Sequence, residues 1–304
     1  MTPAPSPYVL LSGACGTELE RRGAPTPLPL WSAAALLEAP RVVREVHRDH
    51  VRAGAAVVTA NTFRTDRRTL ARAGVHVRAR DLVRTAILLA REGIAEAAPT
   101  HRVLVAGSIA PLEDCFRPDR VPADAELRTE HGFRVGDLVA AGADLALVET
   151  MNTIREAVAA LGACRAARLP AAVSFTCGPG ARLLSGEPLA DAVAAALPFA
   201  PVAILVNCCA LATATQAVRE LARVARGVPV GAYANGLGCP DDTLGWRFEP
   251  GHGAGCAAYV EEATRWLELG ARWIGGCCGT TPAYVEALRR LFDARGIRPA
   301  PRGA

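Results

Sequence analysis

Three cysteines at two places in the chain have the spacing of a metal site that could do chemistry. Cys208 ends the apolar run 204–208, and the adjacent Cys277 and Cys278 end the apolar run that begins at Trp273. Each run is typical of a buried β-strand, so each sulfur is expected where a strand ends and a loop begins. Three thiolates that meet at such a point can hold Zn²⁺ and leave its fourth tetrahedral position for water or substrate, which is the arrangement of a catalytic zinc site.

Two other interpretations of these cysteines stay open. Cysteine often behaves as a small buried hydrophobe, and the pair 277–278 could form a redox-active disulfide, although the ring that a vicinal disulfide closes is strained. Cys209 follows Cys208 and should therefore point the opposite way, into the core. The remaining cysteines are expected to be bystanders that could lie near the metal (Cys15, Cys177 and Cys239) or structural residues (Cys115, Cys164 and Cys256).

The composition excludes several classes of protein. All 34 basic residues are Arg, which excludes enzymes that form a Schiff base through lysine and phosphate-binding loops of the Walker type. The Arg residues are scattered and the formal net charge is only +4, so no nucleic-acid surface is predicted. No apolar run reaches eighteen residues and no secretory leader is seen, which predicts neither membrane insertion nor export. Ten cysteines in such a chain predict reduced thiols and a cytoplasmic protein.

Eight apolar runs recur along the chain, and each is followed by a turn and then by a helical pattern. Eight strands that alternate with helices predict a TIM (β/α)8 barrel, an α/β fold, as a single domain over residues 1–304. A doubly wound open sheet is the main competitor, but its Gly-rich fingerprint after the first strand is missing. The predicted strands are Val9–Ser12, Val57–Asn61, Val103–Ser108, Leu145–Glu149, Ala172–Thr176, Ile204–Cys208, Val230–Asn235 and Trp273–Cys277. The clearest helices are Arg41–Ala53, Val77–Ala97, Ile154–Ala167, Ala212–Ala225, Ala257–Leu269 and Ala283–Arg295.

Such a barrel brings the three cysteines within reach of one ion, because strands six and eight are separated only by strand seven. Two segments rich in Pro, Gly and Asp, Leu112–Asp124 and Gly236–Gly255, are expected to form long loops at the rim of the site. The ends of the chain, residues 1–7 and 298–304, are expected to be frayed. His47 and His50 lie among charged residues on a predicted helix, so a solvated helix face is expected for both.

A series of motifs follows the predicted strands. They are Gly13-Ala14-Cys15-Gly16-Thr17-Glu18-Leu19, Thr59-Ala60-Asn61-Thr62-Phe63, Ala106-Gly107-Ser108-Ile109-Ala110-Pro111, Val148-Glu149-Thr150, Val173-Ser174-Phe175, Val206-Asn207-Cys208, Tyr233-Ala234-Asn235 and Gly275-Gly276-Cys277-Cys278-Gly279-Thr280-Thr281-Pro282. In this combination the chain resembles the zinc-dependent homocysteine S-methyltransferases. That family includes betaine– and S-methylmethionine–homocysteine methyltransferases and the homocysteine module of cobalamin-dependent methionine synthase.

The resemblance implies that Cys208, Cys277 and Cys278 bind Zn²⁺ and that the thiol of homocysteine takes the fourth position and becomes methylated to methionine. Physical chemistry agrees, because a free alkyl thiol has a pKa of about 8.5 whereas a zinc-bound thiol is deprotonated. S-methylmethionine is the first choice of donor, since no cobalamin or folate module is recognisable, and betaine and S-adenosylmethionine remain alternatives. A second hypothesis is a homocysteine-activating subunit that takes its methyl group from a separate corrinoid protein. A third, of another class, is a zinc- or thiol-binding barrel without turnover.

The same resemblance implies that Glu149 receives the substrate ammonium group. The turn amides of Ala14 and Cys15 are expected to receive the substrate carboxylate, and Asn207 and Asn235 to orient nearby polar groups. An aromatic wall around a cationic donor is a further expectation. Its main candidates are Phe63 and Tyr233, followed by Trp31, Trp246 and Phe175, of which Phe175 has an equal claim to core packing.

The chain departs from the family's pattern at two positions. Ser12 stands where the family usually has Asp, and Cys15 stands where Met is common. Without that Asp, either Glu149 alone holds the ammonium group or the thiol is not homocysteine itself. The expected partners are small molecules, a thiol and a methyl donor, with no nucleic acid and no membrane, and a homo-oligomer is left open.

Overall fold

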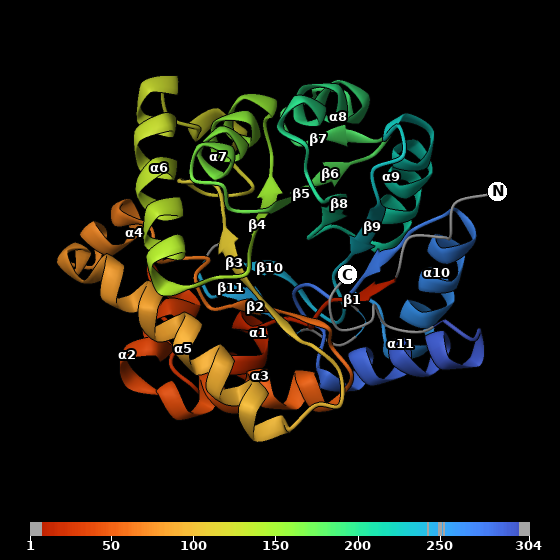
Figure 1. Cartoon of the computed structure of the whole chain (residues 1–304), viewed down its shortest axis with the longest axis horizontal. Helices are drawn as coiled ribbons and strands as arrows, with labels where there is room; N and C mark the ends of the chain where they lie inside the picture. The colour runs from red at the N-terminus through yellow and green to blue at the C-terminus, as the bar shows by residue number, and fades with distance from the viewer. Residues whose placement is uncertain (1–7, 242, 249–250, 252, 298–304) are drawn as a thin grey trace.

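Eight parallel strands stand at the centre of the molecule, and each corresponds to one of the eight apolar runs (Figure 1). The computed structural model describes residues 8–241, 243–248, 251 and 253–297, so the two ends expected to be frayed lie outside the described residues. The strands are β1 (Val9–Leu10), β2 (Val57–Ala60), β3 (Leu104–Ile109), β4 (Leu145–Met151), β5 (Ala171–Phe175), β8 (Ala203–Asn207), β9 (Val230–Tyr233) and β12 (Trp273–Ile274).

The sheet closes on itself. Its strands pair in the order β1-β12-β9-β8-β5-β4-β3-β2, and a parallel bridge between Leu11 and Val57 joins the two outer strands. Backbone hydrogen bonds of 2.8 Å from Ser12 N to Val57 O and from Ala56 N to Leu10 O complete this seam. The predicted TIM barrel is therefore confirmed, and the open sheet is excluded.

Helices surround the strands on all sides (Figure 1). The predicted helices are confirmed to within two residues at each end, and α6 and α8 fill the places between β3 and β4 and between β5 and β8. The α-helices are α1 (Gly16–Arg21), α2 (Ala34–Glu38), α3 (Pro40–Arg52), α4 (Arg67–Arg72), α5 (Ala79–Ala97), α6 (Asp124–Ala141), α7 (Ile154–Ala166), α8 (Leu189–Ala196), α9 (Leu211–Val224), α10 (Cys256–Glu268) and α11 (Pro282–Ala294). Short 3-10 turns are η1 (Trp31–Ala33), η2 (His76–Arg78), η3 (Pro118–Arg120) and η4 (Leu197–Phe199).

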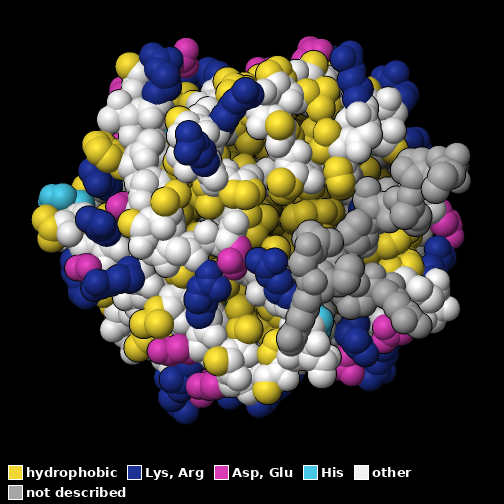
Figure 2. All heavy atoms as spheres, in the orientation of Figure 1, with side chains coloured by type: hydrophobic (Ala, Val, Ile, Leu, Met, Phe, Trp, Pro, Cys, Tyr) yellow, Lys and Arg dark blue, Asp and Glu magenta, His cyan; other side chains and the backbone are white. Residues whose placement is uncertain are grey.

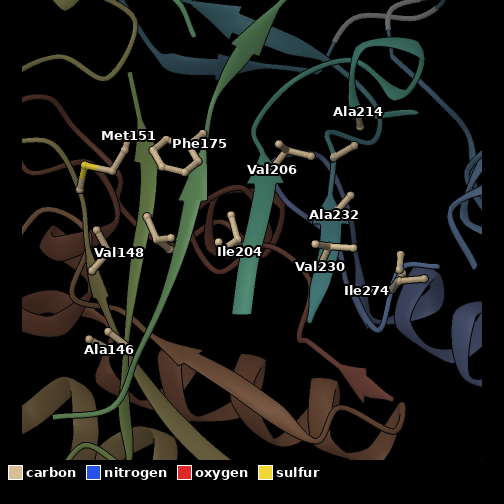
Figure 3. Close-up of a cluster of buried hydrophobic side chains, with 14 of the residues drawn as sticks. Ala146, Val148, Met151, Phe175, Ile204, Val206, Ala214, Val230, Ala232 and Ile274 are labelled. Atoms are coloured by element: carbon tan, nitrogen blue, oxygen red, sulfur yellow. The ribbon is translucent and has the colours of Figure 1, made fainter. Parts of the chain in front are cut away.

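The two faces of the strands bury two separate apolar cores, because side chains alternate along a strand. Toward the helices lie Val148, Phe175, Ile204 and Val206, which Figure 3 draws together with their neighbours. Inside the barrel lies a smaller cluster, formed by Leu11, Val57, Ala106, Leu145, Leu147, Ala172, Ala203, Leu205, Tyr233 and Trp273. This inner cluster closes the barrel below the residues that end the strands.

Both predicted rim loops follow strands, and each carries short structure of its own. The segment 112–124 contains η3, and the segment 236–255 contains an antiparallel hairpin of β10 (Cys239–Asp241) and β11 (Gly245–Arg247). A second hairpin, β6 (Cys177–Gly178) with β7 (Arg182–Leu183), follows β5. Trp246 on β11 is buried, and its Nε1 donates to Leu237 O at 3.1 Å, which ties the hairpin to the start of its own loop.

The prediction of a solvated face for His47 and His50 is wrong, because both side chains are buried. His50 Nε2 donates to Ala14 O at 3.1 Å, and its Nδ1 accepts from Gly13 N at 3.4 Å, so this histidine fastens the loop after β1. Burial lowers the pKa of His47 to about 3, so its ring is neutral. A helical stripe of apolar residues on the same face indicated this burial: Val43, Val46 and Val51.

On the face seen in Figure 2, Arg side chains are interspersed with Asp and Glu around an apolar centre. Across the described residues, several charged side chains pair within one helix, such as Arg265 with Glu261 and Arg290 with Glu286. Among the residues that the structure describes, no helix is both long and apolar enough to span a membrane.

Candidate metal centre

The sulfur atoms of Cys208, Cys277 and Cys278 lie within 4.8 Å of one another. Cys208 follows β8 directly, and the cysteine pair follows β12 after two glycines. The glycines are required by space, since a Cβ at Gly275 would collide with Leu11 and one at Gly276 with Thr280. The structure thus brings together the three cysteines that the sequence singled out.

Asn207 lies beneath this cluster and connects three strands. Its Oδ1 accepts from Thr150 N at 3.0 Å and from Ser174 Oγ at 2.7 Å, and its Nδ2 donates to Thr150 Oγ1 at 2.9 Å. The same Nδ2 lies 3.8 Å from Cys277 Sγ. Asn207 is fully buried and does not line the pocket described below, so the structure places it behind the sulfurs rather than against a substrate.

Two residues at this point have a left-handed backbone. Cys208 has a φ of 54° and Thr150 a φ of 58°, and such conformations are unfavourable for residues with a side chain. Both flank the amide of Asn207, since Cys208 is next to it in the chain and Thr150 is bonded to it twice. The bonds to Asn207 hold the strained Thr150, and Thr150 in turn fixes the direction of its neighbour Glu149.

The donor set fits a single soft metal ion. Sulfurs that bind one Zn²⁺ at about 2.3 Å lie roughly 3.8 Å apart, and the three thiols here are already that close to within about 1 Å. The hydrogen bond from Cys208 lowers the pKa of Cys277 well below its usual value, and the same contact raises the pKa of Cys208. Within the described residues no other group of His, Cys, Asp or Glu has this geometry.

The cysteines form one wall of a cavity of about 130 Å³ at the carboxyl ends of the strands. Residues from the ends of five other strands or their loops complete it, among them Ser12, Phe63, Ser108, Glu149 and Tyr233. In a TIM barrel this end carries the active site. The pocket is large enough for part of a small molecule next to the sulfurs.

Glu149 is a buried carboxylate in this pocket with two hydrogen-bond donors. Ser108 Oγ donates to its Oε1, and the Tyr233 hydroxyl donates to its Oε2 at 3.1 Å. Tyr233 was expected in an aromatic wall, but its hydroxyl instead holds the carboxylate. Ser108 was not selected as a site residue, although its position at the end of the third predicted strand was a signal for it.

The electrostatics of Glu149 follow from its burial. Burial raises the pKa of the carboxyl group to about 7, the negative Cys277 sulfur acts in the same direction, and the bonds from Ser108 and Tyr233 oppose the rise. A carboxylate with these surroundings is ready to receive a cation, because a bound ammonium group would remove the cost of the buried charge.

Aromatic side chains also line the pocket. Trp31 and Phe63 meet edge to face with ring centroids 6.2 Å apart, and Phe116 and Trp246 are further aromatic residues of the lining. Three of these four were expected, whereas Phe116 was missed although it lies in the predicted rim loop 112–124. Phe175 packs in the core toward the helices, which is the alternative that the sequence left open for it (Figure 3).

Of the other residues predicted to contact substrate, three line the pocket and one does not. Ser12 lines the pocket, and its Oγ accepts from Thr59 N at 3.2 Å. Ala14 and Cys15 also line it, but the Ala14 amide already donates to Thr280 Oγ1 at 3.1 Å and has no hydrogen left for a carboxylate. Asn235 is not among the pocket residues, and its backbone N–H donates to Cys209 O at 2.9 Å.

Two cysteines outside the cluster can now be placed. Cys209 packs in the core toward the helices, as predicted. Cys115, expected to be purely structural, lines the pocket, because the rim loop that carries it folds over the cavity. Burial raises the pKa of both Cys15 and Cys115 to about 12, so neither thiol is ionised at neutral pH.

The raised pKa of Glu149 predicts a pH-dependent contribution to stability. Below pH 4.5 the carboxyl group is protonated in both the folded and the unfolded protein. Between pH 4.5 and about 7 only the folded protein keeps this proton, so the free energy of unfolding that depends on this group falls as pH rises, until the group is ionised in both states above about pH 7. Because Glu149→Gln cannot ionise, its stability relative to the unsubstituted protein should rise by on the order of 3 kcal/mol from pH 4.5 to pH 8. Urea denaturation of the metal-free, reduced proteins at several pH values measures this, and a constant difference would contradict it.

Comparison with known proteins agrees with this geometry. The sequence model of the family "Homocysteine S-methyltransferase" matches residues 9–292. The homocysteine S-methyltransferase of Escherichia coli (strain K12) is 36% identical over 295 residues, which cover 92% of this chain and 94% of that protein. The homocysteine S-methyltransferase YbgG of Bacillus subtilis (strain 168) is 32% identical, with 93% of each chain covered.

A solved structure has the same fold at similar identity. The crystal structure of the homocysteine methyltransferase MmuM from Escherichia coli, in its metallated form, superposes with a TM-score of 0.81 at 32% identity, covering 94% of this chain and 97% of that one. With a closed barrel, three convergent cysteines and these matches along almost its whole length, the chain belongs to the homocysteine S-methyltransferase family.

Proposed function

We propose that this protein transfers a methyl group from a small sulfonium donor, S-methylmethionine, to the thiol of homocysteine, with Zn²⁺ held by Cys208, Cys277 and Cys278. The observation that carries the proposal is the position of the three sulfurs. They lie within 4.8 Å of one another in the wall of a pocket that also contains a buried carboxylate and several aromatic rings. Membership of the family supports the acceptor, and the metallated form of the related MmuM structure supports a bound metal.

The three cysteines would hold the ion through sulfur, a donor type that Zn²⁺ binds in both catalytic and structural sites. When bound, Zn²⁺ would keep the thiol of homocysteine deprotonated at neutral pH. Asn207 keeps Cys277 in place from behind, and the glycines at 275 and 276 let the cysteine pair approach β1 and Thr280. The chain's own contribution is thus a prearranged set of three sulfurs beside a pocket.

Glu149 would bind the ammonium group of homocysteine. The carboxylate is buried in the same pocket as the sulfurs and is held on both oxygens by Ser108 and Tyr233, so it cannot turn away. Because burial raises its pKa to about 7, it is ionised above that pH and would accept the ammonium group best there. With Ser12 in place of an acid, Glu149 is the carboxylate available among the described pocket residues.

The donor would lie against the aromatic side of the pocket. A sulfonium ion over an aromatic face gains about 0.5–2 kcal/mol, and the rings of Trp31, Phe116 and Trp246 line the pocket without a cation stacked on them among the described residues. In the transfer, the acceptor sulfur's lone pair bonds to the methyl carbon while the methyl–sulfonium bond breaks and its electrons stay on the departing sulfur. The donor then leaves as a neutral thioether, which an aromatic wall binds less tightly than a cation.

A donor panel tests the proposal. We expect zinc-loaded protein to form methionine from homocysteine with S-methylmethionine, and to do so faster than with betaine, S-adenosylmethionine or methylcobalamin, as measured by mass spectrometry. Selenohomocysteine as acceptor tells whether a selenol replaces the thiol. Turnover only with methylcobalamin would favour an activating subunit that takes its methyl group from a corrinoid protein. Zinc binding without product from any donor would favour a zinc-binding barrel that has no methyltransferase activity.

A further inference from the structure

The pocket contains one cation whose purpose the metal and Glu149 do not explain. Among the described residues that line the cavity, the formally charged side chains outside the cysteines are Glu149 and Arg64. Arg64 lies in the loop after β2, next to Phe63, and its guanidinium carbon is 5.4 Å from the centroid of that ring. A charge of each sign in a small pocket suits a ligand that carries both.

Arg64 lacks the partners that the neighbouring arginines have. Its Nε is buried without a hydrogen-bond partner, and in the part of the chain that the structure describes it forms no ion pair. By contrast, Arg68, four residues further on, pairs with Glu113, Glu126 and Glu130. A buried donor without a partner is destabilising, so a ligand acceptor placed at Arg64 would remove that cost.

The backbone on both sides of Arg64 is held in place. The buried guanidinium of Arg134 donates to Thr62 O at 3.0 Å and to Phe63 O at 3.4 Å, and it reaches Ser108 O at 3.2 Å. On the other side, Asp66 caps α4 by accepting from Thr69 N at 2.8 Å. Arg64 therefore projects from a fixed loop, which reduces the entropy lost when it binds a ligand.

Several other polar groups of the pocket already have partners. The Ala14 amide donates to Thr280, the Gly13 amide donates to His50, and Ser12 Oγ accepts from Thr59 N. Cys15 and Gly16 also line the pocket, but their N–H groups carry no formal charge. The thiols of Cys15 and Cys115 are neutral at physiological pH and weak donors. Arg134 is committed to backbone carbonyls and lies 3.9 Å from Asp66, which leaves Arg64 as the free cation among the described pocket residues.

We infer that Arg64 binds the α-carboxylate of an amino-acid ligand and so makes this pocket selective for amino-acid substrates over simple amines, thiols or sulfonium ions. The inference rests on the proposed function, because that function supplies an amino acid as acceptor and a second one as donor. A planar guanidinium can bind a carboxylate through two parallel hydrogen bonds, and stacking on Phe63 leaves its edge available for them.

Two matched ligand pairs test the inference by binding alone. The acceptor pair is homocysteine and 3-aminopropane-1-thiol, and the donor pair is S-methylmethionine and (3-aminopropyl)dimethylsulfonium; the second member of each pair lacks only the carboxylate. We expect zinc-loaded protein to bind the carboxylate member of at least one pair about 10- to 100-fold more tightly in calorimetric titrations, since a charge-assisted hydrogen bond contributes a factor of this size.

Variants identify the residue responsible. Arg64→Met should abolish the preference in that pair, and Arg64→Lys should keep part of it, because lysine retains the charge but not the paired donors. The matched control is Arg67→Met, since Arg67 also stacks on a ring, that of Phe133, but is exposed and does not line this cavity; its preference should be unchanged. The pair that responds tells whether the carboxylate belongs to the acceptor or to the donor.

The possible results bear on Arg64 and on the proposed function in different ways. Equal binding of both members of both pairs by the unsubstituted protein would overturn the role of Arg64 even if Arg64→Met failed to fold. Retention of the preference by folded Arg64→Met would overturn it as well. A carboxylate preference that depends on Arg64, in a protein that methylates no thiol, would support the inference and refute the function.

Discussion

Replacing Cys208 or Cys278 with alanine is expected to remove the bound metal and to lower methyl transfer by about 1,000-fold or more, while the barrel stays folded. A complete four-ligand zinc site contributes about 10–16 kcal/mol, so the loss of one thiolate ligand removes on the order of 4 kcal/mol, which is about 1,000-fold in affinity. Little core volume is lost, and alanine at 208 is no worse than cysteine for the left-handed φ of 54°. Metal analysis of the purified variants and zinc titration against a chromogenic chelator measure the effect.

Cys209→Ala is the matched control for this prediction. Cys209 is also buried and adjacent in sequence, but it packs in the core toward the helices. This variant should lose stability by about 1 kcal/mol and keep its metal and its turnover. Unchanged zinc content in Cys208→Ala and Cys278→Ala, or equal loss in Cys209→Ala, would remove the three sulfurs from the proposed role.

Glu149→Gln is expected to raise the KM for the thiol acceptor by about 100-fold and to leave the KM for the donor within about threefold. Glutamine has nearly the same shape and can still accept from Ser108 or Tyr233, but it carries no charge for the substrate ammonium group. Removing one partner of a buried charge pair costs about 2–5 kcal/mol, and 2.8 kcal/mol corresponds to about 100-fold. Initial rates at saturating donor and at saturating acceptor separate the two constants.

The pH profile adds an independent check on Glu149. In the unsubstituted protein the acceptor KM should rise as pH falls below about 7, because protonation removes the charge that binds the ammonium group. In Glu149→Gln the part of this dependence with a midpoint near pH 7 should disappear, whereas the part caused by deprotonation of the acceptor thiol should remain. Ser108→Ala serves as the control, since it removes one hydrogen bond and retains the charge, and its acceptor KM should change by about tenfold at most. Equal rises in both KM values would show that Glu149 does not bind the acceptor.

The barrel and the cysteine cluster were predictable because both depend on local patterns. A run such as Ile204–Cys208 identifies its own strand, and in a barrel the strand order follows the chain order, so the carboxyl ends of strands six and eight must be near neighbours. Rim placement of 112–124 and 236–255 follows from the same rule. A residue at the carboxyl end of a strand must therefore lie at the same end of the barrel as the other strand ends.

What the tertiary structure decided is which groups touch. The hydrogen bonds of Glu149 come from β3 and β9, the Ala14 amide is taken by Thr280 from the far end of the chain, and Asn207 turns beneath the sulfurs instead of toward the pocket. Arg64 has no distinguishing pattern in the sequence, where 34 arginines look alike. The physical reason is that the sequence determines where a side chain starts, whereas its partners and its burial depend on contacts between distant segments that exist only once the barrel has closed.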